Sequence, residues 1–397
     1  MKIAYVLSTF PCISETFILR EIVALEKAGI RVIIFALKSS SPGESDEAAS
    51  LMQDAIYRPS PLSPDLIRDE LFFLRRRPLL YLLLLFRTIR RNLLAPVMLL
   101  KSLRNFPVAA HFARVAEKMG ADHIHGHFAF VPADIAATMA ALLDKRFSVS
   151  AHAWDIYTQG KRRLRNRLSH ASFITACTKR ARDYLAGLLP EARISAVHHG
   201  LALDRFTSSP SSEPVVLAVG RLVEKKGYVP LVEACAILAG RDIEFSCVIA
   251  GEGPHRRLLE RMIAKHGLDS RVRLAGKVCG EALMNLYRTA SVFALPSVVA
   301  PSGDVDGLPN AILEAMAMET PVVSTDASSA NEAIVDGENG FIVPAGNPEM
   351  LADRIETLLK DGTLRQKLGS NGRKTVSKHF DIDTNIKQLI QLFSESK

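Results

Sequence analysis

The sequence predicts an α/β protein of two domains, each with a doubly wound parallel sheet and helices on both faces. Short apolar runs alternate with amphipathic stretches of helical length, which is typical of βαβ units. The alternation stops at a polar, turn-rich stretch, 207–214 (TSSPSSEP), and then starts again. With 397 residues, the chain is too long for one hydrophobic core and suits two domains of roughly 200 residues.

The first domain is expected over residues 1–206. Its helical patterns are Thr16–Ala28, Val108–Met119 and Lys179–Leu188, and Gly29 and Gly120 follow two of them, where helix C-caps are expected. A long insertion, 39–105, interrupts the alternation. The expected strands are Ile3–Leu7, Val32–Leu37, His123–His127, Phe147–Ala151, Phe173–Cys177 and Ile194–His198.

The second domain is expected over residues 215–380, after the linker 207–214. Ligands of doubly wound sheets bind beyond the C-terminal ends of the strands, so polar side chains just after a strand are candidate ligand contacts. The expected strands are Val215–Val219, Glu244–Ala250, Val272–Leu274, Val292–Leu295 and Pro321–Ser324. The expected helices are Val229–Ala239, His255–His266, Glu281–Thr289 and Pro309–Met318.

Composition favours a cytoplasmic globular protein. Apolar residues make up 48% and charged residues 23%, so sizeable cores can form. The five cysteines form neither a CxxC pair nor a disulfide framework, which favours a reducing compartment. The N-terminus, MKIAYVLSTF, reads as a first strand and lacks the cleavage site of a signal peptide.

The net charge of +8 is concentrated in the insertion, between Arg68 and Arg104. The longest apolar run there, Pro78–Phe86, is far shorter than the roughly 20 residues that span a bilayer. Two interpretations stay open. The segment 68–104 lies on an anionic membrane surface, at the cytoplasmic face of the inner membrane, or it forms a buried helical hairpin with solvated arginines. No nucleic-acid-binding motif accompanies these basic residues.

The segment Ser302–Glu314, SGDVDGLPNAILE, places Asp306 and Glu314 on either side of an expected helix start. Pro309 fits the first turn of that helix, and the free backbone N–H groups of such a turn attract anions. Ionised carboxylates only accept hydrogen bonds and therefore suit hydroxyl groups. This segment can hold a phosphate and a sugar side by side.

A second cluster, GRLVEKKG, follows the expected strand Val215–Val219 and supplies Arg221 and Lys226. Gly220 and Gly227 bracket it and let the backbone approach a ligand closely. Isolated charges in a loop usually face water, but here GEGP and the carboxylate segment follow neighbouring strands. A diphosphate held by Arg, Lys and a helix terminus needs no metal.

His123, His125 and His127 alternate along one strand, so their side chains share a face. Imidazoles are common zinc ligands. No Asp, Glu or Cys stands at an obvious completing position, so zinc is only a weak, motif-based alternative and no metal site is predicted.

Several motifs together resemble glycosyltransferase family 4: GRLVEKKG, IAGEGP, DGLPNAILEAMAMETPVVST and NEAIVDGENGFIV. In corresponding order the chain also carries FPCISETFILREI, HGHF, SAHAWDIY and HHGLALDRF, which are similar to those of bacterial exopolysaccharide (colanic-acid-type) members. The resemblance covers Met1 to about Lys360, apart from the insertion. It implies a GT-B fold, with the acceptor on the first Rossmann-like domain and a nucleotide-sugar donor on the second. It also implies retention of anomeric configuration, no metal, and a last helix (381–397) returning to the first domain.

The resemblance assigns roles to the donor side. Arg221 and Lys226 match the basic pair on the donor diphosphate, and Glu314 matches the acid that holds the ribose. Asp306 stands where the family has a Glu near the donor sugar; it is one methylene shorter and keeps the charge. The donor-binding residues implied are Gly220, Gly251, Glu252, Gly253, Lys277, Val278, Gly307, Leu308, Pro309, Asn310 and Glu314.

On the acceptor side, His152 resembles the family's catalytic His near the transferred sugar, and Asp155 resembles the acid that follows it. His127 is expected to line the acceptor side. Ser14 as a helix N-cap, with Glu15 in the first turn, is a sufficient structural account of the first loop. Contact of Ser14, Glu15 and Thr16 with phosphate or acceptor is the functional alternative.

The sequence therefore predicts a retaining glycosyltransferase that moves a sugar from a UDP- or GDP-sugar to a hydroxyl of a glycan or lipid-linked glycan. Exopolysaccharide or cell-surface polysaccharide synthesis is the expected setting. No cofactor, metal or nucleic-acid partner is expected. Two alternatives stay open: a nucleotide-sugar epimerase of the same fold, and a non-catalytic nucleotide-sugar-binding subunit.

Overall fold

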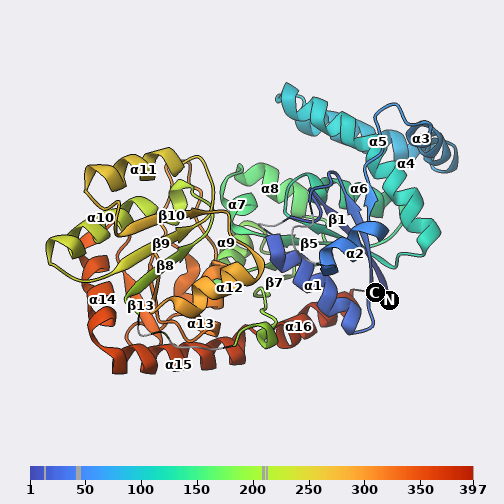
Figure 1. Cartoon of the computed structure of the whole chain (residues 1–397). Helices are drawn as coiled ribbons and strands as arrows, with labels where there is room; N and C mark the ends of the chain where they lie inside the picture. Colours follow the sequence, from blue (N-terminus) through green and yellow to red (C-terminus); the bar gives the residue numbers. More distant parts are fainter. Residues whose placement is uncertain (13–14, 42–45, 208–210, 212, 397) are drawn as a thin grey trace. The chain divides into compact units, whose positions relative to one another are not determined.

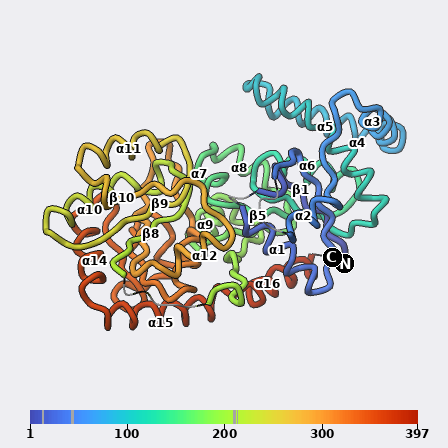
Figure 2. Tube along the Cα trace, viewed as in Figure 1, coloured from blue at the N-terminus to red at the C-terminus, as the bar shows by residue number. Residues whose placement is uncertain are grey.

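The computed structural model describes residues 1–12, 15–41, 46–207, 211 and 213–396. The chain divides into two compact units, each built around one parallel sheet (Figure 1; Figure 2). Unit 1 comprises Met1–Cys177, Ala181–Val197 and Ile386–Lys397; unit 2 comprises Thr178–Arg180 and His198–Asn385. The predicted α/β class is confirmed. The predicted linker, 207–214, falls partly outside the described residues, and its role stays a prediction.

Unit 1 has a seven-stranded sheet in the order β3-β2-β1-β4-β5-β6-β7. Its central strands are buried along their whole length, as expected for a parallel sheet covered by helices on both faces. Strand β3 lies in the insertion and was not predicted, because two residues carry no periodicity. The strands are β1 Lys2–Leu7, β2 Arg31–Ala36, β3 Ile56–Tyr57, β4 His123–His127, β5 Phe147–Ala151, β6 Ile174–Ala176 and β7 Ile194–Ala196.

The insertion folds as α2, β3, α3, α4 and the first half of α5. The predicted helix Val108–Met119 is too short, since α5 is one helix, Pro96–Met119, with Pro107 inside it. Gly120 ends α5 at φ 71°, as expected for a C-cap. The unit 1 helices are α1 Thr16–Lys27, α2 Asp46–Asp54, α3 Pro64–Arg76, α4 Pro78–Asn92, α5, α6 Val131–Leu143, α7 Ala153–Tyr157, α8 Lys161–Leu168 and α9 Lys179–Leu188.

The last helix, α16, spans Ile382–Glu395, and the chain from Ile386 onward groups with unit 1. The ring of Phe393 packs 5.3 Å from that of His123 and 5.4 Å from that of Phe173. Arg193 forms an ion pair with Glu395. These contacts fasten the end of α16 to the sheet of unit 1.

Unit 2 has a six-stranded sheet in the order β10-β9-β8-β11-β12-β13. Strand β13 was not predicted, although its residues belong to a quoted motif. The strands are β8 Val215–Val219, β9 Ser246–Ala250, β10 Val272–Gly276, β11 Val292–Leu295, β12 Val322–Thr325 and β13 Gly340–Val343. The helices are α10 Tyr228–Gly240, α11 Arg256–Lys265, α12 Gly280–Thr289, α13 Asn310–Ala317, α14 Pro348–Lys360 and α15 Gly362–His379.

Candidate functional site

The candidate donor site lies in unit 2, where the strand order reverses. The chain moves outward from β8 to β9 and β10, and then returns to place β11 on the other side of β8. Such a switch point opens a crevice beyond the C-terminal ends of the two strands. The loops that follow β8 and β11 carry GRLVEKKG and the segment Ser302–Glu314.

Backbone contacts lock the loops after β8 and β9 together. Leu222 N donates to Glu252 O (2.9 Å), and His255 N donates to Leu222 O (3.0 Å). A Cβ on Gly251 would lie 1.8 Å from the carbonyl oxygen of Gly220. The glycine at position 251 is therefore required by the packing of one loop on another, a reason that the sequence did not reveal.

Gly227 makes a similar contact with the loop after β11. It has φ 70°, and a Cβ there would lie 1.7 Å from the carbonyl oxygen of Pro296. Val298 N donates to Lys225 O (2.9 Å) beside it. The loops on both sides of the switch point are therefore in van der Waals contact, and their geometry is fixed by the backbone.

A cluster of charges sits where these loops meet. Lys226 Nζ lies 2.9 Å from Asp306 Oδ2, and Ser297 Oγ donates to the same oxygen at 3.2 Å. Lys225 Nζ lies 3.0 Å from Asp304 Oδ1 and 3.5 Å from Asp306 Oδ1. Burial alone would raise the pKa of Asp306, but Lys226 and Lys225 outweigh it and the pKa is lowered. Asp306 is thus held ionised.

The structure therefore brings the predicted residues Lys226 and Asp306 into direct contact. Lys225, Asp304 and Ser297 complete the cluster and were not predicted. The double lysine in GRLVEKKG was the signal in the sequence for Lys225. The sequence of the loop gave no reason to predict that both lysines belong to the site. Arg221 is exposed, and no described residue forms an ion pair with it. Its guanidinium is therefore available for an anion.

The helix start of the carboxylate segment differs by one position from the prediction. Pro309 is the N-cap, with φ −65° and ψ 126°, and α13 begins at Asn310. The ψ of Pro309 lies in the extended region, so the proline ring precedes the first turn of α13 instead of belonging to it. The side-chain oxygen of Asn310 is buried and has no hydrogen-bond partner among the described residues. Gly307 O accepts from Ser329 N (3.0 Å), which ties the turn before the helix to the loop after β12.

Glu314 lies one turn into α13 and is partly buried. Tyr287 of α12 donates its hydroxyl to Glu314 Oε2 at 3.0 Å. This bond fixes the orientation of the carboxylate. Tyr287 was not predicted, since it lies in the last turn of α12 and belongs to none of the motifs.

The remaining donor-side residues follow β9 and β10. Gly251 N donates to Gly276 O (2.7 Å), which joins the two strand ends. Glu252 is exposed and pairs with Arg256 at 3.0 Å. Lys277 is exposed and Val278 partly buried just past the end of β10. These residues therefore surround the same end of the sheet as the charge cluster.

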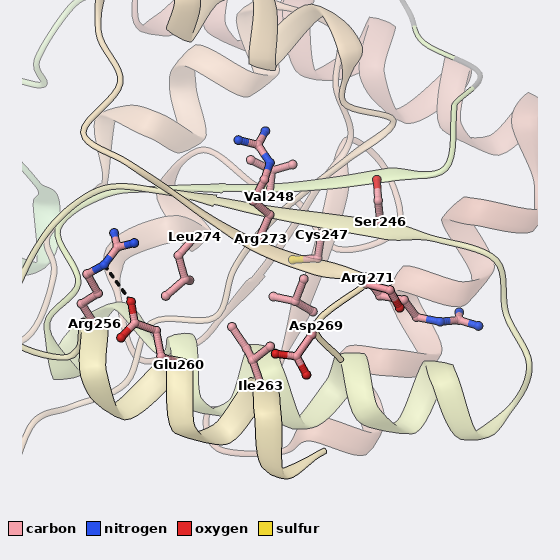
Figure 3. Close-up of a pocket in the computed structure, with 12 residues that line it drawn as sticks. Ser246, Cys247, Val248, Arg256, Glu260, Ile263, Asp269, Arg271, Arg273 and Leu274 are labelled. Atoms are coloured by element: carbon pink, nitrogen blue, oxygen red, sulfur yellow. Dashed lines mark hydrogen bonds and ion pairs between the residues drawn. The ribbon is translucent and has the colours of Figure 1, made fainter. Parts of the chain in front are cut away.

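A separate hollow of about 600 Å³ opens between β9, the edge strand β10 and α11 (Figure 3). Cys247 and Leu274 line its wall, and Arg256 pairs with Glu260 (2.9 Å) at its rim (Figure 3). None of the predicted site residues lines it. It is not part of the candidate donor site.

In unit 1, His152 follows β5 directly and is the N-cap residue of α7. Its ring is packed among aromatic rings, with centroids 4.5 Å from Phe128, 5.0 Å from Phe17 and 5.8 Å from His127. Asp155 is fully buried and accepts from the backbone N–H of His152 (2.8 Å) and of Ala129. Asp155 therefore holds the turn that carries His152.

Burial raises the pKa of Asp155 to about 7, although the backbone donors of Ala129 and His152 favour its charged form. Both of its oxygens are committed to the backbone, so it does not present a carboxylate to solvent. Of the first loop, Glu15 is the N-cap residue of α1, one position later than the predicted N-cap, and Thr16 Oγ1 accepts from Arg20 (3.1 Å). Ser14 lies outside the described residues.

The three alternating histidines form a buried ladder with hydroxyl groups. His125 contacts Ser148 Oγ (2.7 Å) and Ser150 Oγ (3.0 Å), and His123 contacts Ser148 Oγ (2.7 Å). Burial lowers the pKa of His123 to about 4 and that of His125 well below its usual value. Both rings are therefore neutral near pH 7.

An acid does complete this group, contrary to the prediction that no Asp, Glu or Cys does. Glu21 Oε1 lies 3.0 Å from His127 Nε2 and accepts from the Tyr5 hydroxyl at 2.7 Å. One ligand atom each from Glu21, His125 and His127 lies within 4.8 Å of the others. Hydrogen bonds to Ser148 and Ser150 already use both nitrogens of His125. His127 Nδ1 is buried and has no hydrogen-bond partner among the described residues.

Comparison with known proteins decides the family. The model for Glycosyltransferase Family 4 matches residues 14–205, and that for Glycosyl transferases group 1 matches residues 202–375. The chain is 30% identical over 379 residues to the putative colanic acid biosynthesis glycosyltransferase WcaL of Escherichia coli, covering 89% of this chain and 90% of WcaL.

The chain belongs to glycosyltransferase family 4.

A second WcaL, from Salmonella typhimurium, is 28% identical over 412 residues and covers 99% of both chains. Among solved structures, Anabaena HepE in complex with UDP matches this glycosyltransferase with a TM-score of 0.73, 18% identity and full coverage of both chains. Sucrose-phosphate synthase from Thermosynechococcus elongatus matches with a TM-score of 0.74, 20% identity and coverage of 100% and 98%. These likenesses confirm the predicted GT-B fold.

Proposed function

We propose that this glycosyltransferase transfers a sugar from a UDP- or GDP-sugar to a hydroxyl of a glycan or lipid-linked glycan, with retention of configuration and without a metal ion. The setting would be exopolysaccharide synthesis, in keeping with the colanic acid biosynthesis in the names of the WcaL relatives. The place would be the cytoplasmic face of the membrane. The observation that carries the proposal is the Lys226–Asp306 pair beside the start of α13, at the switch point of unit 2.

The donor diphosphate would be bound by cations and backbone donors. Arg221 is exposed and without an ion-pair partner in the described chain, and Lys226 stands at the same loop. The first N–H groups of α13 add the positive end of a helix dipole. These groups would offset the charge that develops on the departing nucleoside diphosphate. Structures of HepE with UDP and UDP-glucose show that a neighbour of the same fold binds such a donor.

The sugar and ribose would be bound by the two carboxylates. Asp306 is held ionised by Lys226 and Lys225 and accepts hydrogen bonds from sugar hydroxyls. Glu314, oriented by Tyr287, accepts from the ribose hydroxyls. The strand ends at Gly251, Glu252, Gly253, Lys277 and Val278 would receive the base largely through backbone groups.

Proton transfer would not need an enzyme base in unit 2. Asp306 has a lowered pKa and is therefore a weak base, and one oxygen of Glu314 is occupied by Tyr287. We propose that an oxygen of the leaving phosphate accepts the proton of the attacking hydroxyl as the bond between anomeric carbon and phosphate breaks. Attack on the same face of the sugar gives retention.

Unit 1 would supply His152 to the transferred sugar, with Asp155 positioning the turn that carries it. His127 is completely buried and bonded to Glu21, so it would support the ring of His152 by stacking. Glu15 and Thr16 at the start of α1 stay candidates for the acceptor side.

The test is isothermal titration of the whole chain with UDP-, GDP- and ADP-sugars, followed by incubation of the tightest donor with lipid-linked acceptors. We expect micromolar binding, product formation, a retained anomeric linkage by NMR, and unchanged rates in EDTA. Donor epimerisation without an acceptor would replace the proposal with an epimerase. Binding without turnover on any acceptor would replace it with a non-catalytic subunit.

A further inference from the structure

Unit 1 contains a strongly basic pocket that the donor chemistry does not use. It has a volume of about 300 Å³ and lies at the ends of β1 and β2, against α5. Its walls include Ser8, Thr9, Lys38, Arg58, Lys101 and Arg104, and no acidic side chain. Four cations and two hydroxyl groups therefore converge on a space large enough for a phosphate or diphosphate group.

The cations of this pocket have no counter-charge in the described chain. No ion pair is formed there by Lys38, Arg58, Lys101 or Arg104, whereas Arg76 and Arg91 of the same insertion pair with Glu117 and Asp134. Burial and the nearby charge of Arg104 lower the pKa of Arg58. Two guanidinium groups held close together without a carboxylate indicate a place for an anion.

The helices beside the pocket expose an apolar surface. On α4, Leu79 (84% exposed), Leu82, Leu83 and Phe86 (60%) stand at positions i, i+3, i+4 and i+7, on one face. The opposite face of α4, with Tyr81, already packs against the core of unit 1. The exposed face is therefore a second apolar face with no partner in the described structure.

The apolar surface, hereafter the α4–α5 surface, continues into the first half of α5 with Val97, Leu100 and Leu103. No residue from 82 to 105 is buried. Helices α4 and α5 are labelled in Figure 1. Of the seventeen exposed large hydrophobic side chains in the described chain, thirteen lie between Leu62 and Leu103. Such a concentration marks an interaction surface.

The α4–α5 surface and the basic pocket are adjacent. Lys101 and Arg104, which line the pocket, alternate along α5 with Leu100 and Leu103. The sequence has no Asp or Glu between Glu70 and Glu117. In the described chain no helix is long and apolar enough to cross a bilayer. An apolar helix face flanked only by cations is suited to lie in the headgroup region of an anionic membrane.

We propose that unit 1 binds a phosphate-bearing membrane lipid, with its phosphate or diphosphate in the basic pocket and its hydrocarbon chain beside the α4–α5 surface. The inference rests on the proposed function in one respect: it assigns the sugar acceptor to the lipid-phosphate-linked class. Of the two interpretations of residues 68–104, it selects the membrane surface over the solvated hairpin.

The test is co-sedimentation of the full chain with vesicles, without any nucleotide sugar. Three compositions are compared: pure phosphatidylcholine; phosphatidylcholine with phosphatidylglycerol; and phosphatidylcholine with a polyprenyl diphosphate at the same surface charge. We expect the strongest binding to the third. Since each basic residue near such a surface contributes about a fivefold gain, Lys101→Ala/Arg104→Ala should weaken that binding by at least about tenfold.

Matched variants separate the pocket from general effects of charge and hydrophobicity. Arg257→Ala/Arg261→Ala removes two exposed arginines of α11 in unit 2 and should bind vesicles like the wild type. Leu79→Ser/Leu83→Ser/Phe86→Ser should weaken binding to both anionic vesicles, and Val335→Ser, an exposed aliphatic position of unit 2, should not. All substituted side chains are exposed, and circular dichroism checks that the variants fold.

Three results would overturn the proposal. Equal binding to both anionic compositions would mean that surface charge alone attracts the chain. Displacement from polyprenyl diphosphate vesicles by equimolar inorganic diphosphate would mean a site for a soluble anion. A wild-type dimer that Leu79→Ser/Leu83→Ser/Phe86→Ser converts to a monomer, without vesicle binding, would make the α4–α5 surface an interface between copies. Because no donor is present, these results leave the donor site of unit 2 unaffected, and a failure of donor binding would not change them.

Discussion

The C-terminal ends of the two sheets carry different chemistry on the same framework. In unit 2, glycines let neighbouring loops touch, and a cluster of lysines and aspartates lies at their junction. In unit 1, buried histidines within β4 are bonded to serines of β5, and an aspartate just after the end of β5 accepts from the backbone. Unit 2 keeps Asp306 ionised at this edge, whereas unit 1 keeps His123 and His125 neutral within β4.

This difference follows from what each edge has for partners. Asp306 is buried but lies within 3.5 Å of two ammonium groups, so its pKa falls. Asp155 is fully buried but has mainly backbone N–H partners, and its pKa rises to about 7. Burial raises the pKa at both sites, and the neighbouring charges decide whether the net shift is upward or downward. The unit 2 edge is suited to a dianionic ligand, and the unit 1 edge to positioning the ring of His152.

The largest expected effect concerns the loop contacts of unit 2. Gly227→Ala would place a Cβ 1.7 Å from the carbonyl oxygen of Pro296 at a positive φ. Strain of this kind should lower the free energy of unfolding by about 3 kcal/mol or more and abolish nucleoside-diphosphate binding. Chemical denaturation measures the free energy of unfolding, and isothermal titration measures nucleoside-diphosphate binding. Gly240→Ala is the control: nothing lies within 4 Å of its Cβ, and stability should not fall. A stable, donor-binding Gly227→Ala would show that the loops can separate.

The second effect concerns the buried ion pair. Lys226→Met leaves Asp306 with Lys225 at 3.5 Å and should lower the free energy of unfolding by about 2–3 kcal/mol, below the usual cost because one ammonium remains. Adding Asp306→Asn should restore most of that stability without restoring nucleoside-diphosphate affinity. If the double variant regains affinity as well, Lys226 serves only to neutralise Asp306.

The sequence predicted the framework well because periodicity and glycine positions report the backbone. The bounds of β4, β5, β8, β11 and α9 are those predicted. It failed where no local pattern exists: β3 is a two-residue strand, and α5 runs through Pro107, where a helix normally breaks. At the site, motifs found Lys226 and Asp306. Glu21 and Tyr287 were missed because their roles depend on long-range contacts with His127 and Glu314.

The third effect tests the unit 1 edge by pH. The pKa of Asp155 is about 7 in the folded chain and near 4 when unfolded, so the folded state binds the extra proton. The stabilisation that protonated Asp155 gives the folded state is full below about pH 4 and is lost as the pH rises through 7. Between pH 5 and 7 this lowers the free energy of unfolding by about 2 kcal/mol. His123 and His125, whose pKa values are lowered, change stability in the opposite direction over this range.

The relevant quantity is therefore the wild-type free energy of unfolding minus that of Asp155→Asn, measured by urea denaturation at each pH. This difference should shrink as the pH rises. The exposed Asp269→Asn in unit 2 should give a difference that does not change with pH. A difference that stays constant between pH 5 and 7 would mean that Asp155 is ionised throughout and that its backbone donors outweigh burial.

The smallest effect on stability, and the one most specific to the donor, is expected at Arg221. Its side chain is exposed and has no ion-pair partner in the described chain, so Arg221→Ala should change the free energy of unfolding by less than about 0.5 kcal/mol. Nucleoside-diphosphate affinity should fall about tenfold, and Arg221→Lys should recover only part of it because the bidentate geometry is lost. Isothermal titration at two salt concentrations measures the nucleoside-diphosphate affinity of both variants. An unchanged nucleoside-diphosphate affinity in Arg221→Ala would mean that the lysines and the start of α13 form the whole anion site. The unit 2 edge would then differ from the unit 1 edge only in its buried charges.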